Sequence, residues 1–227
     1  MNGHDLGSRP WVTFDMDNTL IQSPYWRLHF RPWLEAEAQR LGTDYRSLWR
    51  HFHQRSEELW RRGRWVDSFD WPAIAEHLGL SRVPEVRVSS PKPVRALVPT
   101  GVEAMLWSLR QLNVRLAIVT NGFWAFQYPY LKALGWPYLL DAVITPDRIG
   151  AAKPNPAIMV PVSPGLIHVG DRLSHDVLAA RRSGRKSALV GPSSEHDHID
   201  PLMPANLEPD WIINDWRHLP QIVASML

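Results

Sequence analysis

The stretch that decides the fold is Trp11-Val12-Thr13-Phe14-Asp15-Met16-Asp17-Asn18-Thr19. Four apolar or β-branched residues precede Asp15, as in a strand that is buried on both faces of a sheet. Short runs of the same kind recur along the chain, each followed by a polar or turn-forming residue: 114–119, 142–144, 166–169, 187–190 and 211–213. These runs predict the strands of a parallel sheet.

Helical patterns lie between several of these runs. Thr100-Gly101-Val102-Glu103 has the form of a capping box, which predicts the start of a helix. Residues 126–134 predict a second helix that ends at Gly135, and residues 176–183 predict a third that ends at Gly184. Alternating strands and helices predict an α/β fold with a doubly wound parallel sheet.

Residues 21–95 interrupt this alternation. They contain no convincing buried strand, and their apolar residues follow a helical pattern over residues 33–41, 45–60 and 71–78. We therefore expect a core made of residues 1–20 and 96–227, with a helical domain of residues 21–95 inserted after the first strand. Most tryptophans of the insertion are expected to pack its small core, with Trp26 near a substrate entrance. Pro91-Lys92-Pro93 predicts a stiff linker back to the core.

The candidate catalytic residues follow the predicted strands. In a parallel α/β sheet, ligands bind beyond the carboxyl ends of the strands, so Asp15, Thr120 and Asp171 can meet there if their strands are neighbours. Asp15 at a strand end and Asp17 on the exit loop suit a nucleophile working with a general acid and base. Taken alone, the pattern Asp-x-Asp-x-Thr is weak evidence, since a turn with a threonine cap looks the same.

Two further segments suit a phosphoryl group. Thr120-Asn121-Gly122 offers a hydroxyl and backbone N–H groups. Lys153 offers a compact positive charge just before a predicted helix start, where Asn155 would be the cap and Pro156 the first helical residue. Each segment alone also reads as an ordinary turn or a surface lysine.

Acidic residues predict a cation. Bringing Asp15, Asp171 and Asp176 together would be strongly repulsive without one. Mg²⁺ takes oxygen ligands and keeps several waters, so it fits such a cluster.

In their order and placement, these residues resemble the motifs of the haloacid dehalogenase superfamily of phosphotransferases. Residues 15–19 resemble its first motif, Thr120 the second, Lys153 the third, and Gly170-Asp171 with Asp176 the fourth. The resemblance covers residues from about 12 to 20 and from 97 to 190. It implies a Rossmann-like core, with residues 21–95 in the place of the type-one cap of that superfamily.

The resemblance implies a role for each matching residue. Asp15 is the expected nucleophile, which forms an aspartyl-phosphate, and Asp17 protonates the leaving oxygen and then activates water. Thr120 and Lys153, with Asn121 and Gly122, are expected to hold the phosphoryl group.

The same resemblance implies a metal site and a substrate class. Asp15, the backbone carbonyl of Asp17, and Asp171 are expected to bind Mg²⁺, while Asp176 supports the metal waters or Lys153. The expected substrate is a small phosphorylated metabolite such as a nucleotide, flavin or sugar phosphate, hydrolysed as a phosphomonoester.

Alternative functions stay open at this point. A phosphomutase, or a hydrolase of C–Cl or C–P bonds, is possible within the same superfamily. Asp17 argues against a dehalogenase, which has no leaving oxygen to protonate. A catalytically silent binding module on this fold is a third alternative.

Composition excludes several classes. The absence of cysteine rules out disulfides and zinc-thiolate sites. The formal net charge is +2 with no basic arm, so no nucleic-acid partner is expected. No run is long and apolar enough to span a bilayer. The polar start, residues 1–10, lacks an apolar signal-peptide stretch, so a cytoplasmic location is expected. The sequence does not indicate an oligomeric state.

Two further segments carry weaker expectations. Pro161 and Pro164 permit only a short helix after Pro156, so one flank of the sheet is expected to be thin, which leaves either a dimer surface or a weakened site. His196-Asp197-His198 can bind a transition metal, although its place in a polar loop favours an incidental cluster.

Overall fold

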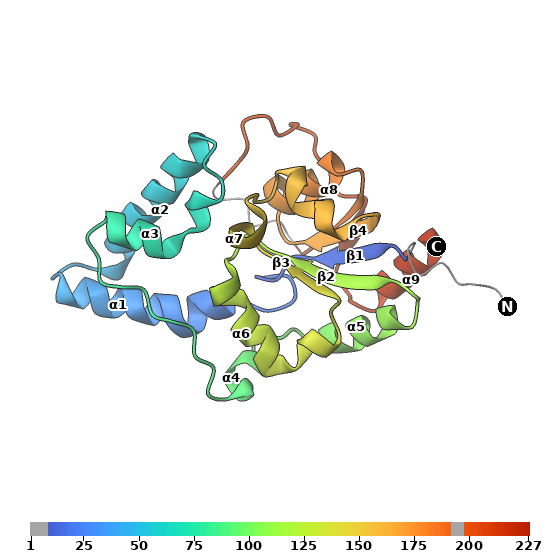
Figure 1. Cartoon of the computed structure of the whole chain (residues 1–227), viewed down its shortest axis with the longest axis horizontal. Helices are drawn as coiled ribbons and strands as arrows, with labels where there is room; N and C mark the ends of the chain where they lie inside the picture. The colour runs from blue at the N-terminus through green and yellow to red at the C-terminus, as the bar shows by residue number, and fades with distance from the viewer. Residues whose placement is uncertain (1–8, 192–197) are drawn as a thin grey trace.

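A computed structural model describes residues 9–191 and 198–227 of the chain (Figure 1). Within these residues, six strands form one sheet in the order β3-β2-β1-β4-β5-β6, and all neighbouring strands run parallel. The strands are β1 (Trp11–Phe14), β2 (Arg115–Val119), β3 (Ala142–Ile144), β4 (Gly165–Gly170), β5 (Lys186–Val190) and β6 (Trp211–Ile213). The predicted doubly wound parallel sheet is confirmed.

The sheet is built outward from β1. The chain first adds β2 and β3 on one side of β1 and then crosses to add β4, β5 and β6 on the other, so the direction of winding changes between β1 and β4. Phe14 is paired with Ile118 of β2 and with Val169 of β4. The polar residues that follow these strands therefore emerge at one edge, where α/β proteins bind their ligands.

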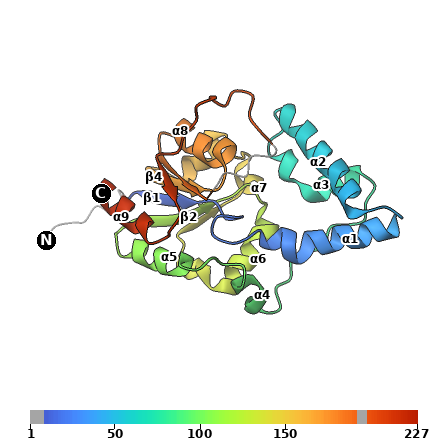
Figure 2. The same cartoon turned by 180° about the vertical axis from the view of Figure 1, so that it is seen from behind.

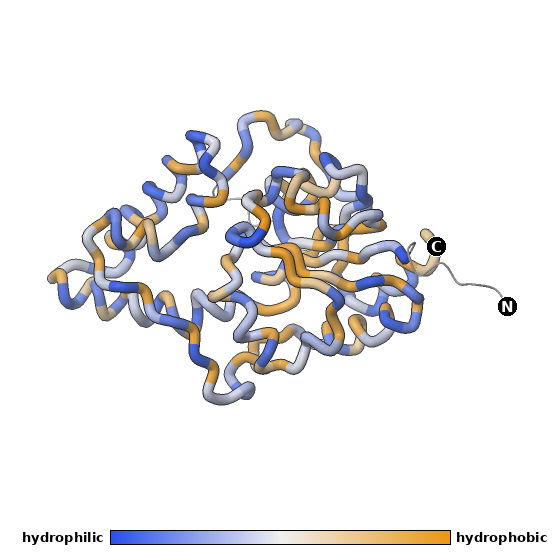
Figure 3. The backbone as a smooth tube through the Cα atoms, viewed as in Figure 1, coloured by the Kyte–Doolittle hydropathy of each residue, from blue (hydrophilic) through white to orange (hydrophobic). Residues whose placement is uncertain are grey.

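Helices cover both faces of the sheet (Figures 1 and 2). One face carries α5 (Val102–Arg110), α6 (Trp124–Leu134) and α9 (His218–Met226). The other carries α8 (Leu178–Arg182) and the 3₁₀ helix η4 (Pro156–Val162), while the short α7 (Pro146–Ile149) follows β3. In Figure 3 the tube is strongly hydrophobic at the centre of the sheet, and all four residues of β1 are buried.

Residues 21–95 contain helices and no strand of the sheet; most of these helices gather beyond the carboxyl ends of the strands (Figure 1), whereas the last one packs against α6. They are the π-helix η1 (Trp26–Phe30), α1 (Arg31–Arg40), α2 (Tyr45–Arg61), the 3₁₀ helix η2 (Asp67–Phe69), α3 (Trp71–His77) and α4 (Pro91–Arg95). Phe30 is fully buried at their centre, with ring centroids 4.3 Å from Trp71 and 5.0 Å from Phe52. Aromatic packing therefore holds these short helices together.

The predicted capping box is wrong. Helix α5 begins after Gly101, whose φ of +92° is the left-handed conformation that glycine adopts without strain, and no side chain caps it. The Glu103 carboxylate instead accepts hydrogen bonds from Arg95 at 2.8 Å and from the indole N–H of Trp136 at 3.0 Å. The Glu103 side chain is therefore engaged by Arg95 and Trp136 and does not cap its own helix.

Residues 91–93, predicted to form a stiff linker, lie in the short helix α4 (Pro91–Arg95). The Ser90 hydroxyl oxygen accepts from the N–H of Lys92 at 3.3 Å, and Pro91 lies in the first turn, where its missing N–H costs nothing. The helix predicted for residues 176–183 begins earlier, as the π-helix η5 (Leu173–Val177) followed by α8.

The short helix predicted after Pro156 is confirmed, and it fills its flank of the sheet. The side chain of Asn155 caps η4 by accepting from the N–H of Ala157 at 3.0 Å. Three apolar side chains of η4, those of Ile158, Met159 and Val162, are buried in one cluster with Trp11, Ala117 and Val119 of the sheet. The sheet is therefore not bare beside η4, contrary to the expected thin flank.

In the described part of the chain, every helix is too short or too polar to cross a membrane. The polar start on which the expected location depends lies mostly in residues 1–8, outside the described residues. His196 and Asp197 of the candidate metal cluster also lie outside them.

Candidate active site

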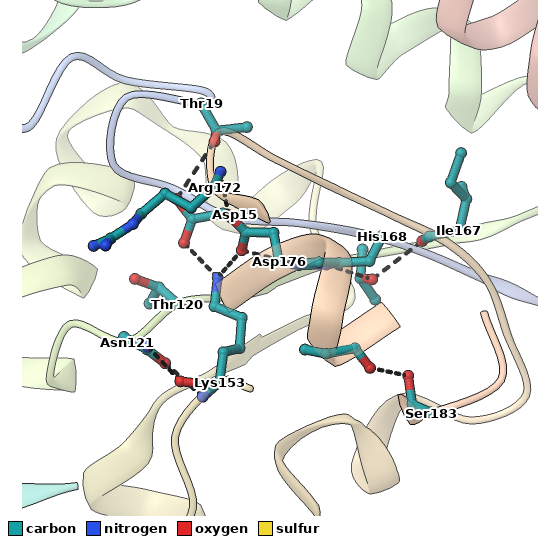
Figure 4. A network of polar contacts seen from close by, with 12 residues as sticks. Asp15, Thr19, Thr120, Asn121, Lys153, Ile167, His168, Arg172, Asp176 and Ser183 are labelled. Atoms are coloured by element: carbon teal, nitrogen blue, oxygen red, sulfur yellow. Dashed lines mark hydrogen bonds and ion pairs between the residues drawn. The ribbon is translucent and has the colours of Figure 1, made fainter. Parts of the chain in front are cut away.

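Asp15 is the first residue after β1, the strand from which the sheet is built. Its backbone N–H donates to the carbonyl of Val169 at 2.8 Å, which ties the end of β1 to β4. Its side chain is buried, and its second carboxylate oxygen, Oδ2, accepts from the Thr19 hydroxyl at 3.4 Å. The turn after β1 therefore fixes Asp15 with its carboxylate at the sheet edge (Figure 4).

Lys153 lies at the centre of the polar network in Figure 4. Its ammonium group donates to Asp15 Oδ1 at 2.6 Å and to Asp176 Oδ1 at 2.6 Å, and the residue is only 1% exposed. Burial acts to lower the pKa of Lys153, but the two carboxylates outweigh it and raise the pKa above its ordinary value. Lys153 therefore stays charged.

The backbone of Lys153 is fixed by Asn121. The side-chain oxygen of Asn121 accepts from the Lys153 N–H at 2.7 Å, and its side-chain nitrogen donates to the Lys153 carbonyl at 3.0 Å. The Asn121 side chain thus contacts Lys153, so that only its backbone N–H is left to meet a phosphoryl group. Thr120, which follows β2, accepts from the Gly122 N–H at 3.1 Å.

Asp176 is held from three directions. Its Oδ2 accepts from the Arg172 N–H at 3.0 Å, and its Oδ1 lies 3.1 Å from His168 Nε2 as well as near Lys153. A Cβ atom at Gly170 would lie 2.1 Å from the Asp176 carboxyl carbon, so only glycine admits Asp176 here. Burial acts to raise the pKa of Asp176, but Lys153 and His168 outweigh it and hold the pKa well below its ordinary value.

His168 was not among the site residues predicted from the sequence. Burial lowers its pKa to about 4, so the imidazole is neutral at neutral pH. Its Nε2 lies 3.1 Å from Asp176 Oδ1, and its Nδ1 lies 3.0 Å from the hydroxyl oxygen of Thr13, which donates its own proton to the Ile167 carbonyl. A polar residue inside the apolar run 166–169 was the one signal for it.

Three carboxylates crowd around this network. Asp15, Asp171 and Asp176 each offer an oxygen, and these atoms all lie within 4.8 Å of one another. Burial, and then the negative charges of Asp15 and Asp176, raise the pKa of Asp171 to about 8. Burial likewise raises the pKa of Asp15 to about 6, despite Lys153. Three carboxylate oxygens at this spacing fit a divalent cation such as Mg²⁺, whose charge would offset their mutual repulsion.

Asp17 stands apart from this carboxylate group. Its Oδ2 accepts from the side-chain nitrogen of Gln127 at 2.8 Å. Burial, and then the charge of Asp15, raise the pKa of Asp17 to about 7. Of the predicted metal ligands, Asp17 alone has its side chain outside the group formed by Asp15, Asp171 and Asp176.

All eight predicted site residues line one cavity of about 350 Å³: Asp15, Asp17, Thr120, Asn121, Gly122, Lys153, Asp171 and Asp176. Its opposite wall is aromatic, with Tyr25, Trp26, Phe69 and Trp71 from residues 21–95 and Phe126 from α6. Trp26 lines the cavity, as the sequence analysis expected. The cavity thus has a polar, charged wall at the sheet edge and a wall of these five aromatic residues, which we call the aromatic roof.

The fold is that of known haloacid dehalogenase-type structures. Over 94% of this chain and 97% of the other, the structure of a HAD phosphatase from Thermococcus onnurineus superposes with a TM-score of 0.67 at 24% sequence identity. The family model for haloacid dehalogenase-like hydrolases matches residues 10–184. The chain therefore belongs to the haloacid dehalogenase-like hydrolase family.

Curated relatives carry phosphatase names. The chain is 28% identical to ribulose-1,5-bisphosphate 5-phosphatase of Halopiger xanaduensis over 213 residues, which are 82% of this chain and 86% of that enzyme. It is 29% identical to glyceraldehyde 3-phosphate phosphatase of Methanopyrus kandleri over 144 residues, or 60% of this chain. That second match spans 58% of the Methanopyrus enzyme.

The buried ion pairs of Lys153 predict a large stability effect. Lys153→Met leaves the buried Asp15 and Asp176 without their cation, and we expect it to lower the free energy of unfolding by about 3–5 kcal/mol at neutral pH. Lys186→Met is the matched control, because Lys186 pairs with Asp210 at 2.7 Å on the surface, where such a pair contributes at most about 1 kcal/mol. Urea unfolding measures both, and equal losses would contradict the prediction.

Proposed function

We propose that the chain is a Mg²⁺-dependent phosphomonoester hydrolase that works through an aspartyl-phosphate on Asp15. One observation carries the proposal: the Asp15 carboxylate, the Lys153 ammonium and the acid Asp17 face one cavity at the end of β1. The family match and the phosphatase names of the relatives support it.

The first step forms the covalent intermediate. A carboxylate oxygen of Asp15 attacks the phosphorus, the bond from phosphorus to the leaving oxygen breaks, and Asp17 gives that oxygen its proton. Lys153, the Thr120 hydroxyl and nearby backbone N–H groups hold the other phosphoryl oxygens. Such transfer depends on positioning and charge neutralisation more than on covalent assistance from the protein.

The second step releases phosphate. Asp17, now ionised, takes a proton from water as the water oxygen attacks the phosphorus, and the bond to Asp15 breaks. A pKa near 7 suits Asp17 to both duties, because an acid and base works best close to the operating pH. A dehalogenase would have no leaving oxygen for Asp17 to protonate.

Asp15, Asp171 and the backbone carbonyl of Asp17 would hold the metal, with Asp176 supporting its waters or Lys153. When bound, Mg²⁺ supplies positive charge that offsets the carboxylates and the phosphate.

The substrate is a small phosphorylated metabolite, and we propose that residues 21–95 act as a cap domain on a core of residues 1–20 and 96–227. The aromatic roof of the cavity suits a leaving group with a flat or ring-shaped apolar face. Among the expected nucleotide, flavin and sugar phosphates, a leaving group with a ring therefore fits best.

Loss of the nucleophile is the direct test of the function. Asp15→Asn should fold normally but lose at least about 10³-fold in kcat on p-nitrophenyl phosphate with Mg²⁺, because an amide cannot form the intermediate. Asp215→Asn, on the surface beside Arg217, should keep its activity. An Asp15→Asn variant with most of its rate would rule out the proposed mechanism.

Mg²⁺ should stabilise the protein more as pH rises. The raised pKa values of Asp15 and Asp171 mean that the folded chain holds these protons up to about pH 6 and 8. Without metal, their contribution to stability falls from about pH 4 to pH 8, since the unfolded chain gives up the protons first. Mg²⁺ binds the ionised carboxylates, so its gain in Tm should be larger at pH 8 than at pH 5, as measured by thermal unfolding with and without EDTA. An equal gain at both pH values would contradict this cation site.

The aromatic roof predicts substrate preference. Trp71→Leu should raise KM for a nucleoside monophosphate by about two- to tenfold, since stacking on an aromatic ring contributes about 0.5–1.5 kcal/mol. KM for glycerol phosphate, which has no ring, should change little. If both KM values stay unchanged, the leaving group does not contact this wall.

A further inference from the structure

Gln127 connects helix α6 to the proposed acid. It lies in the first turns of α6, is 3% exposed, and donates from Nε2 to Asp17 Oδ2 at 2.8 Å across 110 residues of sequence. Within the described residues, its amide oxygen makes no hydrogen bond. Asp17 is therefore the polar group to which this buried amide donates.

Gly122 makes room for this contact. A Cβ atom at residue 122 would lie 2.0 Å from Gln127 Nε2 and 2.8 Å from its Cγ, far inside van der Waals contact. Gly122 is not among the glycines with positive φ, so the backbone conformation does not require glycine there. Space for the Gln127 side chain is the physical reason for a glycine at the end of Thr120-Asn121-Gly122.

We infer that Gln127 is a positioning residue that holds Asp17 in its working orientation and that Gly122 gives it access. The inference rests on the proposed acid and base role of Asp17. Because Gln127 donates to Oδ2, the proton of neutral Asp17 is held at Oδ1, from which it passes to the leaving oxygen. An amide suits this task, since it donates a hydrogen bond at every pH and adds no charge beside the phosphate.

The dependence on the leaving group separates positioning from folding. p-Nitrophenyl phosphate releases a stable phenolate that needs little protonation, whereas benzyl phosphate, of similar shape, releases an alkoxide that needs the acid. Gln127→Met removes the donor and keeps the length of the side chain. We expect it to lower kcat/KM for benzyl phosphate at least tenfold more than for p-nitrophenyl phosphate, because general acid catalysis contributes about 10²–10⁴-fold. Mere structural damage would lower both equally.

Gly122→Ala tests the same contact from the other side. Its methyl group should displace Gln127 and give the same selective loss, so the inference remains testable if Gln127→Met folds poorly. Gln111→Met, at the exposed end of α5, is the matched control and should leave both substrates unaffected. Thermal unfolding of each variant confirms that the compared proteins are folded.

The variant Asp17→Asn separates the proposed acid role of Asp17 from its positioning by Gln127. It should show the same selective loss, and combining it with Gln127→Met should add little, as for residues that act as a unit. If Asp17→Asn affects both substrates equally, the acid role fails and the inference fails with it. If Asp17→Asn is selective while folded Gln127→Met and Gly122→Ala are not, Gln127 does not position Asp17, and the proposed function stands.

Discussion

The site depends on one buried ammonium group. Lys153 joins Asp15, at the end of β1, to Asp176, in the helix after β4, with two contacts of 2.6 Å. Burying a charge is costly unless partners compensate it, so the segments that carry these three residues must meet. Even then, Asp171 adds a third carboxylate beside one ammonium group, and its raised pKa reflects that negative excess. This excess of negative charge suits the site to receive a cation.

The surrounding chain serves this arrangement. The change of winding direction between β1 and β4 places Asp15 and Asp171 side by side, and Asn121 clamps the backbone of Lys153 with two hydrogen bonds. His168, neutral and buried, orients Asp176 from behind. The helices of residues 21–95 contribute no acid or base to the cavity. They line it instead with the aromatic rings of Tyr25, Trp26, Phe69 and Trp71.

The strands were predictable because burial on both faces leaves a continuous apolar run. The polar residues that follow these runs, Asp15, Thr120 and Asp171, are among those that line the cavity. What the sequence did not reveal depends on contacts between distant segments. Glu103 had the spacing of a capping box, but Arg95 and Trp136 take its carboxylate. Gln127 looked like any polar residue on a helix, since its partner lies 110 residues away. No local pattern encodes such a pair.

Two glycines of the site, Gly122 and Gly170, limit which substitutions the protein can accept. At Gly122 and at Gly170, a single methyl group would collide with Gln127 or with Asp176. Even alanine, the smallest substitution, would displace Gln127 or Asp176 from its position. The aromatic roof faces no such limit, since one ring can replace another at modest cost. Substitutions in the aromatic roof should therefore be tolerated more readily than substitutions of Gly122 or Gly170.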